Sequence, residues 1–305
     1  MNTTAPSTPL DPAIALMQQR WKDSGIPDLY EGGNGPVSRE RARNVRCVFY
    51  PKPALPTGSM SWRSIAGPGG PMAVQIVRPV QGESLGTLVY FHGGGWVLGD
   101  LDSHEAHAIR LANRSQVTVL HVDYRLGPEH PFPAAPLDAC AALDWAWAHA
   151  DELGGAGKPV AVGGDSAGGN LAAVAALHAR DRGMGLAAQL LIYPATDLRG
   201  MRHSLVGQMY FGAAAETSAL DPRASPLLAP SLQGLAPAII GVGHHDFLYA
   251  DNLAYRKALE EAGVPLVWRD FPELNHGFFS FVSISEASAR AADLLCDDLR
   301  ALMKA

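Results

Sequence analysis

Hydrophobic and polar positions follow two different periods along this chain. From residue 59 onward, short apolar or alternating runs typical of strands recur between longer stretches whose apolar residues return at helical spacing. Because helical stretches separate most of these runs, the pattern predicts βαβ crossovers and an α/β fold with a mostly parallel sheet, covered by helices on both faces. The strand-type runs are 59–65, 72–77, 87–91, 117–122, 159–162, 189–193, 238–242 and 265–268.

The first two and the last of these runs are expected at the edges of the sheet. Pro68-Gly69-Gly70-Pro71 supplies a turn between the first two runs, so we expect them to pair antiparallel. The last run, near Pro265 to Trp268, is expected to be an exposed edge strand. Since an exposed edge can pair with a second copy of the chain, this run is a candidate homodimer surface.

The first fifty residues have a helical pattern that is separate from the rest. Asp11-Pro12 is typical of a helix start, and Gly32-Gly33-Asn34-Gly35-Pro36 then interrupts the chain. Ser38 is expected to cap a second helix, from Arg39 to about Val45. These helices could form a lid over a cleft, and simple packing onto the core explains their pattern equally well.

A second departure from the alternation covers about residues 199–222, where Gly, Met, Tyr, Phe and Ala occur in no clear period. We interpret it as an insertion that leaves the core. The predicted organisation is an N-terminal helical cap segment over 1–50 and a catalytic domain over 51–305 that contains this cap insertion.

Composition and charge exclude several classes of protein. Of 305 residues, 47% are hydrophobic and 18% charged, which indicates a globular chain rather than a disordered one. The net charge is −6, with no long basic run, so neither nucleic acid nor an anionic membrane is an expected partner. Neither a secretory signal nor a membrane span is visible. Cys47, Cys140 and Cys296 are far apart and odd in number, so we expect a reducing, cytoplasmic location.

One Gly-flanked serine stands at the centre of the candidate chemistry. Gly164-Asp165-Ser166-Ala167-Gly168-Gly169 lies between the strand-type run 159–162 and an Ala-rich helical run. A G-x-S-x-G sequence between a strand and a helix is typical of a nucleophile elbow, in which the serine occupies a strained turn at a helix N-terminus. The pentapeptide alone is weak evidence, so the residues around it must support the assignment.

A serine hydroxyl needs a base, and the base needs a group that orients it. His276 follows the last strand-type run, and Asp246 follows the run before it. The order Ser166, Asp246, His276 is the order required of an α/β-hydrolase triad, so these three are the predicted catalytic residues. Asp251, on the following helix, is a second candidate acid, while His178 and His203 lie in places less suited to a base.

Three consecutive glycines are candidates for stabilising a tetrahedral oxyanion. His92-Gly93-Gly94-Gly95 ends the buried run 87–91, which we expect to neighbour the elbow strand. Backbone N–H groups of glycines can approach a reacting oxygen without side chains in the way. We therefore predict an oxyanion hole from the N–H groups of Gly94, Gly95 and Ala167, with Tyr124 and Arg125 bracing the loop.

Four motifs can be compared with known families: His92–Trp96, Asp123–Leu126, Pro128–Ala135 and Gly164–Gly169. Together they resemble the hormone-sensitive-lipase-like esterases (bacterial family IV), in the branch with Gly-Asp-Ser-Ala-Gly-Gly at the elbow. The resemblance implies an α/β-hydrolase fold with an eight-stranded sheet, a helical cap, and hydrolysis of short- to medium-chain carboxylic esters without a cofactor. The acid loop, Asp246-Phe247-Leu248-Tyr249-Ala250, departs from the family pattern Asp-Pro-Leu-Arg-Asp by lacking the later carboxylate.

Other readings of the same residues are kept open. The triad chemistry would act equally on amides, lactones or carbamates or transfer an acyl group, and a non-catalytic ligand-binding protein of this fold is a remote alternative. No metal site is expected, because adjacent histidines such as His244 and His245 project in different directions. The candidate substrate-binding residues, each also explicable as core, are Trp96, Asp165, Tyr193, Met209, Tyr210 and Phe211.

Overall fold

An eight-stranded sheet forms the centre of the computed structural model, which describes residues 8–305. The strand order is β1-β2-β4-β3-β5-β6-β7-β8. The pairs β1–β2 and β2–β4 are antiparallel, and all the others are parallel, which confirms the predicted sheet and its antiparallel first pair. The strands are β1 (Met60–Gly67), β2 (Gly70–Val77), β3 (Thr87–Phe91), β4 (Thr118–Val122), β5 (Val160–Asp165), β6 (Gln189–Ile192), β7 (Ala238–His245) and β8 (Leu266–Asn275).

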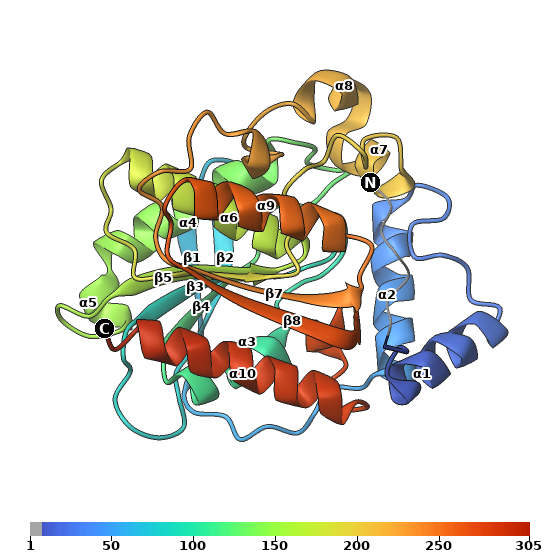
Figure 1. Ribbon diagram of the computed structural model, residues 1–305, viewed down its shortest axis with the longest axis horizontal. Helices are drawn as coiled ribbons and strands as arrows, with labels where there is room; N and C mark the ends of the chain where they lie inside the picture. The colour runs from blue at the N-terminus through green and yellow to red at the C-terminus, as the bar shows by residue number, and fades with distance from the viewer. Residues whose placement is uncertain (1–7) are drawn as a thin grey trace.

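Helices cover both faces of this sheet (Figure 1). One face carries α4 (Ala134–Ala148), α6 (Ala167–Asp181) and α9 (Tyr249–Glu261), with the short α5 (Ala150–Leu153) after α4, and the other carries α3 (Glu105–Ser115) and α10 (Glu286–Leu302). Strand β3 explains why both faces need cover, because all its residues are buried. Its successive side chains point to opposite faces, Val89 and Phe91 into one hydrophobic core and Leu88 and Tyr90 into the other.

The remaining helices gather at the carboxyl end of the sheet, toward which the arrowheads of β7 and β8 point (Figure 1). They are α1 (Pro12–Asp23), α2 (Gly35–Phe49), α7 (Leu205–Phe211) and α8 (Ala215–Ser218). Short 3₁₀ turns complete the chain at 212–214, 226–228 and 278–280. The N-terminal helices and the insertion therefore lie over the end of the sheet where the loops after β3, β5, β7 and β8 emerge.

The second N-terminal helix begins earlier than the sequence predicted. Asn34, not Ser38, is its N-cap: the Asn34 side chain accepts a hydrogen bond from the Val37 N–H at 3.1 Å. Pro36 fits within the first turn, where a missing N–H leaves no hydrogen bond unmade. The run of Gly, Asn and Pro that the sequence presented as an interruption is thus the helix start, and Ser38 is buried inside the helix.

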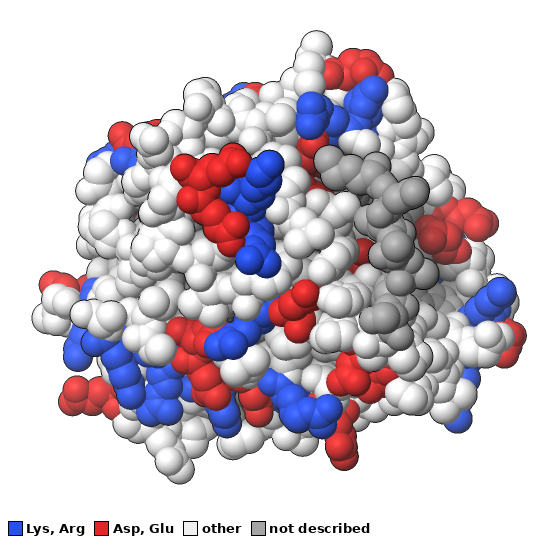
Figure 2. Space-filling view, in the orientation of Figure 1, with Lys and Arg blue, Asp and Glu red and all other residues white. Residues whose placement is uncertain are grey.

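Opposite charges alternate on the outer faces of α9 and α10 (Figure 2). Arg256 pairs with Glu260 along α9, while Arg269 of β8 pairs with Asp298 of α10. Such a mixed surface agrees with the absence of a long basic run in the sequence. Within residues 8–305, no helix is long and apolar enough to cross a membrane.

Candidate active site

Ser166 occupies the sharp turn between β5 and α6. Its φ of 55° and ψ of −115° are rarely adopted by residues other than glycine, so the backbone is strained at this residue, as the elbow motif predicts. The turn can pass this close to β3 only because residue 168 is glycine. A Cβ at Gly168 would lie 1.9 Å from the Phe91 carbonyl oxygen.

Asp246 and His276 reach Ser166 from the loops that follow β7 and β8. The Ser166 Oγ lies 2.8 Å from the His276 Nε2, and the His276 Nδ1 lies 2.8 Å and 2.9 Å from the two carboxylate oxygens of Asp246. Asp246 is buried and also accepts a hydrogen bond from the Leu248 N–H at 2.7 Å. The rings of Tyr193 and Phe247 flank the imidazole, with centroids 4.8 Å and 4.5 Å away.

The other acids and bases that follow the elbow contact different partners. Asp251 accepts hydrogen bonds from the Thr196 N–H and hydroxyl at 2.7 Å and 2.6 Å, behind the loop that carries Asp246. The structure therefore brings only His276 and Asp246 to the serine among these candidates. The other histidines contact Asp144 (His178), Glu216 (His203), Asp270 (His244) and the Thr8 carbonyl (His245).

The glycine loop after β3 lies beside the elbow, because β3 and β5 are hydrogen-bonded neighbours. Gly94 has a φ of +126°, a conformation that side-chain-bearing residues rarely adopt. Gly94, Gly95, Ala167 and Ser166 line one cavity. The N–H groups of Gly94, Gly95 and Ala167 donate to no acceptor within residues 8–305, so all three are available to a bound oxygen.

Two neighbours hold the loop in place. The Tyr124 hydroxyl donates to the His92 carbonyl at 2.7 Å, and its ring stacks on the His92 imidazole with centroids 4.4 Å apart. Arg125 instead pairs with the buried Asp138 on α4. Tyr124 thus contacts the loop directly, as the sequence interpretation suggested, whereas Arg125 anchors the segment that carries Tyr124.

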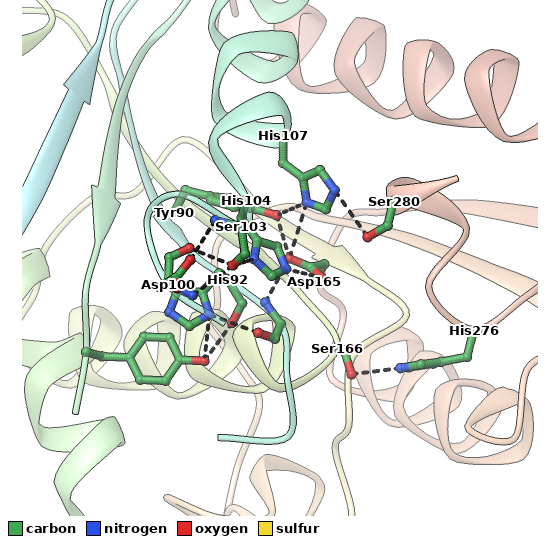
Figure 3. A network of polar contacts seen from close by, with 12 residues as sticks. Tyr90, His92, Asp100, Ser103, His104, His107, Asp165, Ser166, His276 and Ser280 are labelled. Carbon is green, nitrogen blue, oxygen red and sulfur yellow. Dashed lines mark hydrogen bonds and ion pairs between the residues drawn. The ribbon is translucent and has the colours of Figure 1, made fainter. Parts of the chain in front are cut away.

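Asp165, the residue before the nucleophile, belongs to a buried polar network (Figure 3). Its Oδ1 accepts hydrogen bonds from the Tyr90 hydroxyl at 2.5 Å and from the Gly93 N–H at 3.0 Å. His104, at the N-cap of α3, and His107, within α3, approach it with nitrogen–oxygen distances of 3.7 Å and 3.9 Å. The network therefore ties the elbow strand to the glycine loop and to α3.

Charge in this network is concentrated on the carboxylate. Burial would raise the pKa of Asp165, but His104, His107 and the Tyr90 hydroxyl hold it well below its ordinary value. Burial also lowers the pKa of His104 well below its ordinary value, so that imidazole is neutral at pH 7. An ionised Asp165 can therefore hold the Gly93 amide as a hydrogen-bond acceptor.

The sequence interpretation missed this histidine cluster. Its signal was the density of histidines over 92–121. Ligand atoms of His104, His107 and Asp165 lie within 4.8 Å of one another, and this is the one group with metal-like proximity among residues 8–305. Because Tyr90 and Gly93 already use one oxygen of Asp165, the contacts present explain its burial without an ion.

A cavity of about 560 Å³ opens beside Ser166 and His276. Three of the six candidate substrate-binding residues line it, namely Trp96, Asp165 and Tyr193. Met209, Tyr210 and Phe211 do not: they lie buried against other side chains, and Tyr210 stacks on Trp96 with centroids 4.4 Å apart. These three pack behind the cavity wall, because the helix of the insertion presents Val206 rather than its aromatic residues to the cavity.

Twelve further lining residues come from segments that the sequence described only as a candidate cap. The N-terminal helices and their connection contribute both apolar and basic side chains, and the insertion contributes Met201 and Val206. The N-terminal residues that line the cavity are Met17, Gln18, Trp21, Leu29, Tyr30, Arg39, Ala42, Arg43, Arg46 and Tyr50. Arg39, Arg43 and Arg46 were detectable in the sequence, since their spacing places them on one helix face.

Comparisons with known proteins agree with this arrangement. Residues 88–280, more than half of the chain, match the family described as alpha/beta hydrolase fold. The carboxylic ester hydrolase LipN of Mycobacterium tuberculosis is 39% identical, over 96% of this chain and 83% of LipN. The carboxylesterase NlhH of the same organism is 35% identical over 92% of each chain.

Solved structures show the same architecture. The hyperthermophilic esterase from the archaeon Pyrobaculum calidifontis superposes with a TM-score of 0.86 at 34% sequence identity, covering 98% of this chain and all of that one. Its likeness includes the N-terminal part of the chain, which lies outside the matched family region. The chain belongs to the hormone-sensitive-lipase-like esterase family of the alpha/beta hydrolase fold.

Proposed function

We propose that the protein hydrolyses carboxylic esters with short- to medium-chain acyl groups through an acyl-enzyme formed on Ser166. The observation that carries this proposal is the continuous chain of hydrogen bonds from the Ser166 Oγ through His276 to Asp246, at the wall of a cavity. Ester hydrolysis as such is the activity named for the full-length relatives LipN and NlhH.

In the proposed first step, Ser166 attacks the ester carbonyl and His276 takes its proton through Nε2. His276 then gives the proton to the departing alcohol, which leaves an acyl group on Ser166. A water molecule, deprotonated by the same imidazole, releases the acid and restores the serine. Asp246 fixes the ring orientation through Nδ1–H and stabilises the imidazolium that forms.

Gly94, Gly95 and Ala167 supply the oxyanion hole in this mechanism. Their N–H groups make no hydrogen bond within residues 8–305, so none has to be broken when negative charge develops on the carbonyl oxygen. Each such donor contributes roughly 2.7–4 kcal/mol of transition-state stabilisation in enzymes where one has been removed. Ala167 also stands at the start of α6, where the helix dipole favours an anion.

The size of the cavity supports the choice of acyl length. A volume of about 560 Å³ suits a small molecule and is bounded by Trp21, Tyr30 and Val206. In our proposal, residues 1–50 and the insertion at about 199–222 act as the cap of a catalytic domain that spans 51–305. The cap would hold the substrate and keep bulk water away from the acyl-enzyme.

Replacing Ser166 by Ala tests the nucleophile. We expect kcat for a short p-nitrophenyl ester to fall roughly 10⁴-fold or more, because the remaining groups cannot form the acyl-enzyme. Wild-type protein should give a burst of p-nitrophenol in rapid-mixing experiments, and the variant should give none.

Two further measurements make this test decisive. The far-UV circular dichroism and melting temperature of Ser166→Ala should match those of the wild type, so that lost activity is not lost folding. A matched panel of esters and amides under single-turnover conditions establishes which acyl bond is preferred. Unchanged turnover in Ser166→Ala would refute the proposal.

Two properties outside the site complete the proposed description. Cys47, Cys140 and Cys296 are all unpaired, which supports a reducing, cytoplasmic setting. Strand β8 lies at one end of the sheet order, and its outer edge supports assembly into a homodimer. No cofactor takes part in the proposed chemistry, and nucleic acid is not a proposed partner.

A further inference from the structure

Three arginines of α2 lie on one side of the substrate cavity. Arg39, Arg43 and Arg46 follow the spacing i, i+4 and i+7, which places them on a single helix face, and all three line the cavity that contains Ser166. Hydrolysis of a simple aliphatic ester uses no cation at this position. The contacts of each guanidinium therefore decide whether the arginines are structural or available.

Arg39 is a structural residue. It donates to the Val97 carbonyl at 3.0 Å and pairs with Glu129. These contacts hold α2 against the segment that follows the glycine loop. Arg39 therefore has little capacity left for a ligand.

Arg43 and Arg46 are much less engaged. Arg43 has one ionic contact, 3.7 Å from Asp100, and Arg46 has one, 3.5 Å from Asp102. Neither guanidinium donates a hydrogen bond to any group in residues 8–305, although each carries five N–H donors. The side chain of Arg46 is 14% exposed and that of Arg43 is 50% exposed, so the unused N–H donors of both face solvent or the cavity rather than another protein group.

The acidic partners have stronger contacts of their own. Asp102 lies 2.6 Å from the Lys52 Nζ, and Asp100 accepts the Ser103 N–H at 2.6 Å. An anion that displaced the loose contacts of the arginines would therefore leave neither carboxylate without a partner. Asp165, the other carboxylate on the cavity wall, is turned toward Tyr90 and Gly93.

We propose that Arg43 and Arg46 form an anion-binding subsite, and that the preferred substrates are esters with a carboxylate at the end remote from the scissile carbonyl. This inference rests on the proposed esterase function and specifies its substrate class. A carboxylate matches the planar fork of a guanidinium and would supply the hydrogen bonds that both arginines lack. The carboxylate binds and orients the substrate; the bond that breaks remains the ester bond at Ser166.

Matched substrate pairs test the proposal. Ethyl hydrogen adipate and ethyl hexanoate have the same acyl length, and only the first has a carboxylate at the end of the acyl chain. In the second pair, γ-acetoxybutyrate and butyl acetate, only the first has a carboxylate at the end of the alcohol chain. We expect kcat/KM to favour the anionic member of at least one pair. Arg43→Gln and Arg46→Gln should each lower the anionic-to-neutral ratio of kcat/KM by about 10-fold, the usual loss for one charge-assisted hydrogen bond.

Arg290→Gln is the control for the change in net charge. It removes an exposed arginine of α10 outside the cavity and should leave the anionic-to-neutral ratio of kcat/KM unchanged. Arg43→Lys keeps the charge but not the fork, and should lose part of the preference. Equal ratios for wild type, Arg43→Gln and Arg46→Gln would overturn the proposal.

Binding to an inactive variant separates this inference from the function on which it rests. Adipate binding to Ser166→Ala, measured by calorimetry, should weaken about 10-fold when Arg46→Gln is added. No adipate binding to Ser166→Ala would overturn the subsite. If the wild type failed to hydrolyse all four esters while adipate still bound, the esterase proposal would fail and the subsite would stand.

Discussion

Asp251 shows how strongly one side chain depends on its surroundings. It lies in the first turn of α9, and its carboxylate accepts hydrogen bonds from Thr196 on the segment after β6. Burial raises the pKa of Asp251 from 3.8 to about 6, against the opposing effect of these hydrogen bonds. The residue therefore joins two segments behind the candidate acid loop, although it contacts neither Ser166 nor His276.

This pKa gives stability a definite dependence on pH. The folded protein binds the Asp251 proton more tightly than the unfolded chain, so the free energy of unfolding falls as pH rises from about 4 to about 6 and then levels off. Asp251→Asn keeps an oxygen for the backbone N–H groups and cannot ionise. We expect the variant to be more stable than the wild type at pH 7 by roughly 1–2 kcal/mol, and about equally stable at pH 4.

Urea denaturation between pH 4 and pH 7 measures this difference. Asp181→Asn, which changes an exposed carboxylate on α6, serves as the control and should follow the wild-type profile. Parallel pH profiles for wild type and Asp251→Asn would contradict the expectation.

Among the elements, the connection between β5 and the loop after β3 matters most for the site. Gly93, the residue before Gly94, donates its N–H to the side chain of Asp165. Asp165 in turn is the residue before the nucleophile. Through this single bond, the strand that carries Ser166 also sets the position of the proposed oxyanion donors. Asp165 is thus a positioning residue.

Asp165→Ala would remove the shared acceptor of Gly93 and Tyr90. We expect kcat to fall by roughly 10-fold or more with a smaller change in KM, since misplaced donors weaken transition-state binding more than substrate binding. Asp165→Asn retains an oxygen acceptor and should restore much of the loss. Steady-state kinetics on a neutral ester give both parameters, and an unchanged kcat in Asp165→Ala would exclude the positioning role.

The order of strands and helices was largely predictable from the sequence. Apolar residues recur at one spacing in buried strands and at another in helices that pack on them, so the spacing indicates the type of element. All eight strand-type runs correspond to strands, although β8 continues to Asn275, well beyond residue 268. Residues 270–273 alternate between exposed and half-buried positions, so this part of β8 lacks the apolar signal of a strand. Charged positions such as Asp270 and Glu273 are tolerated there because β8 has a neighbour on one side only.

The cavity wall was less predictable than the sheet. Ser166, His276 and Asp246 could be named because their chain order and flanking strands are constrained by the topology. Met209, Tyr210 and Phe211 were misplaced, because composition does not reveal which face of a short helix meets a cavity. The wall residues of α1 and α2 depend on how those helices dock, which is a tertiary property.

At the scale of the whole molecule, the sheet ends in two different edges. The middle of β1 is exposed at one end, while β8 is longer and mostly half-buried at the other. Only pairing with another chain or solvent can satisfy the outer backbone groups of either edge. The proposed homodimer would use β8.

Hydrogen exchange as a function of protein concentration distinguishes the two edges. If β8 forms the dimer, amides on its outer edge should exchange more slowly at concentrations where light scattering detects a dimer, and those of β1 should not change. A monomer at all concentrations, or protection confined to β1, would contradict this assembly.

The positions of the chain ends have a practical consequence. The Thr8 carbonyl accepts a hydrogen bond from His245 at 2.9 Å, one residue before Asp246, whereas Ala305 follows α10 toward the opposite end of the sheet (Figure 1). A support or fusion partner attached at the carboxyl terminus would lie at the end of the sheet away from the cavity that contains Ser166. Immediately before Thr8 the same attachment would lie close to His245, which lines that cavity, so immobilised or tagged preparations should be built from the carboxyl end.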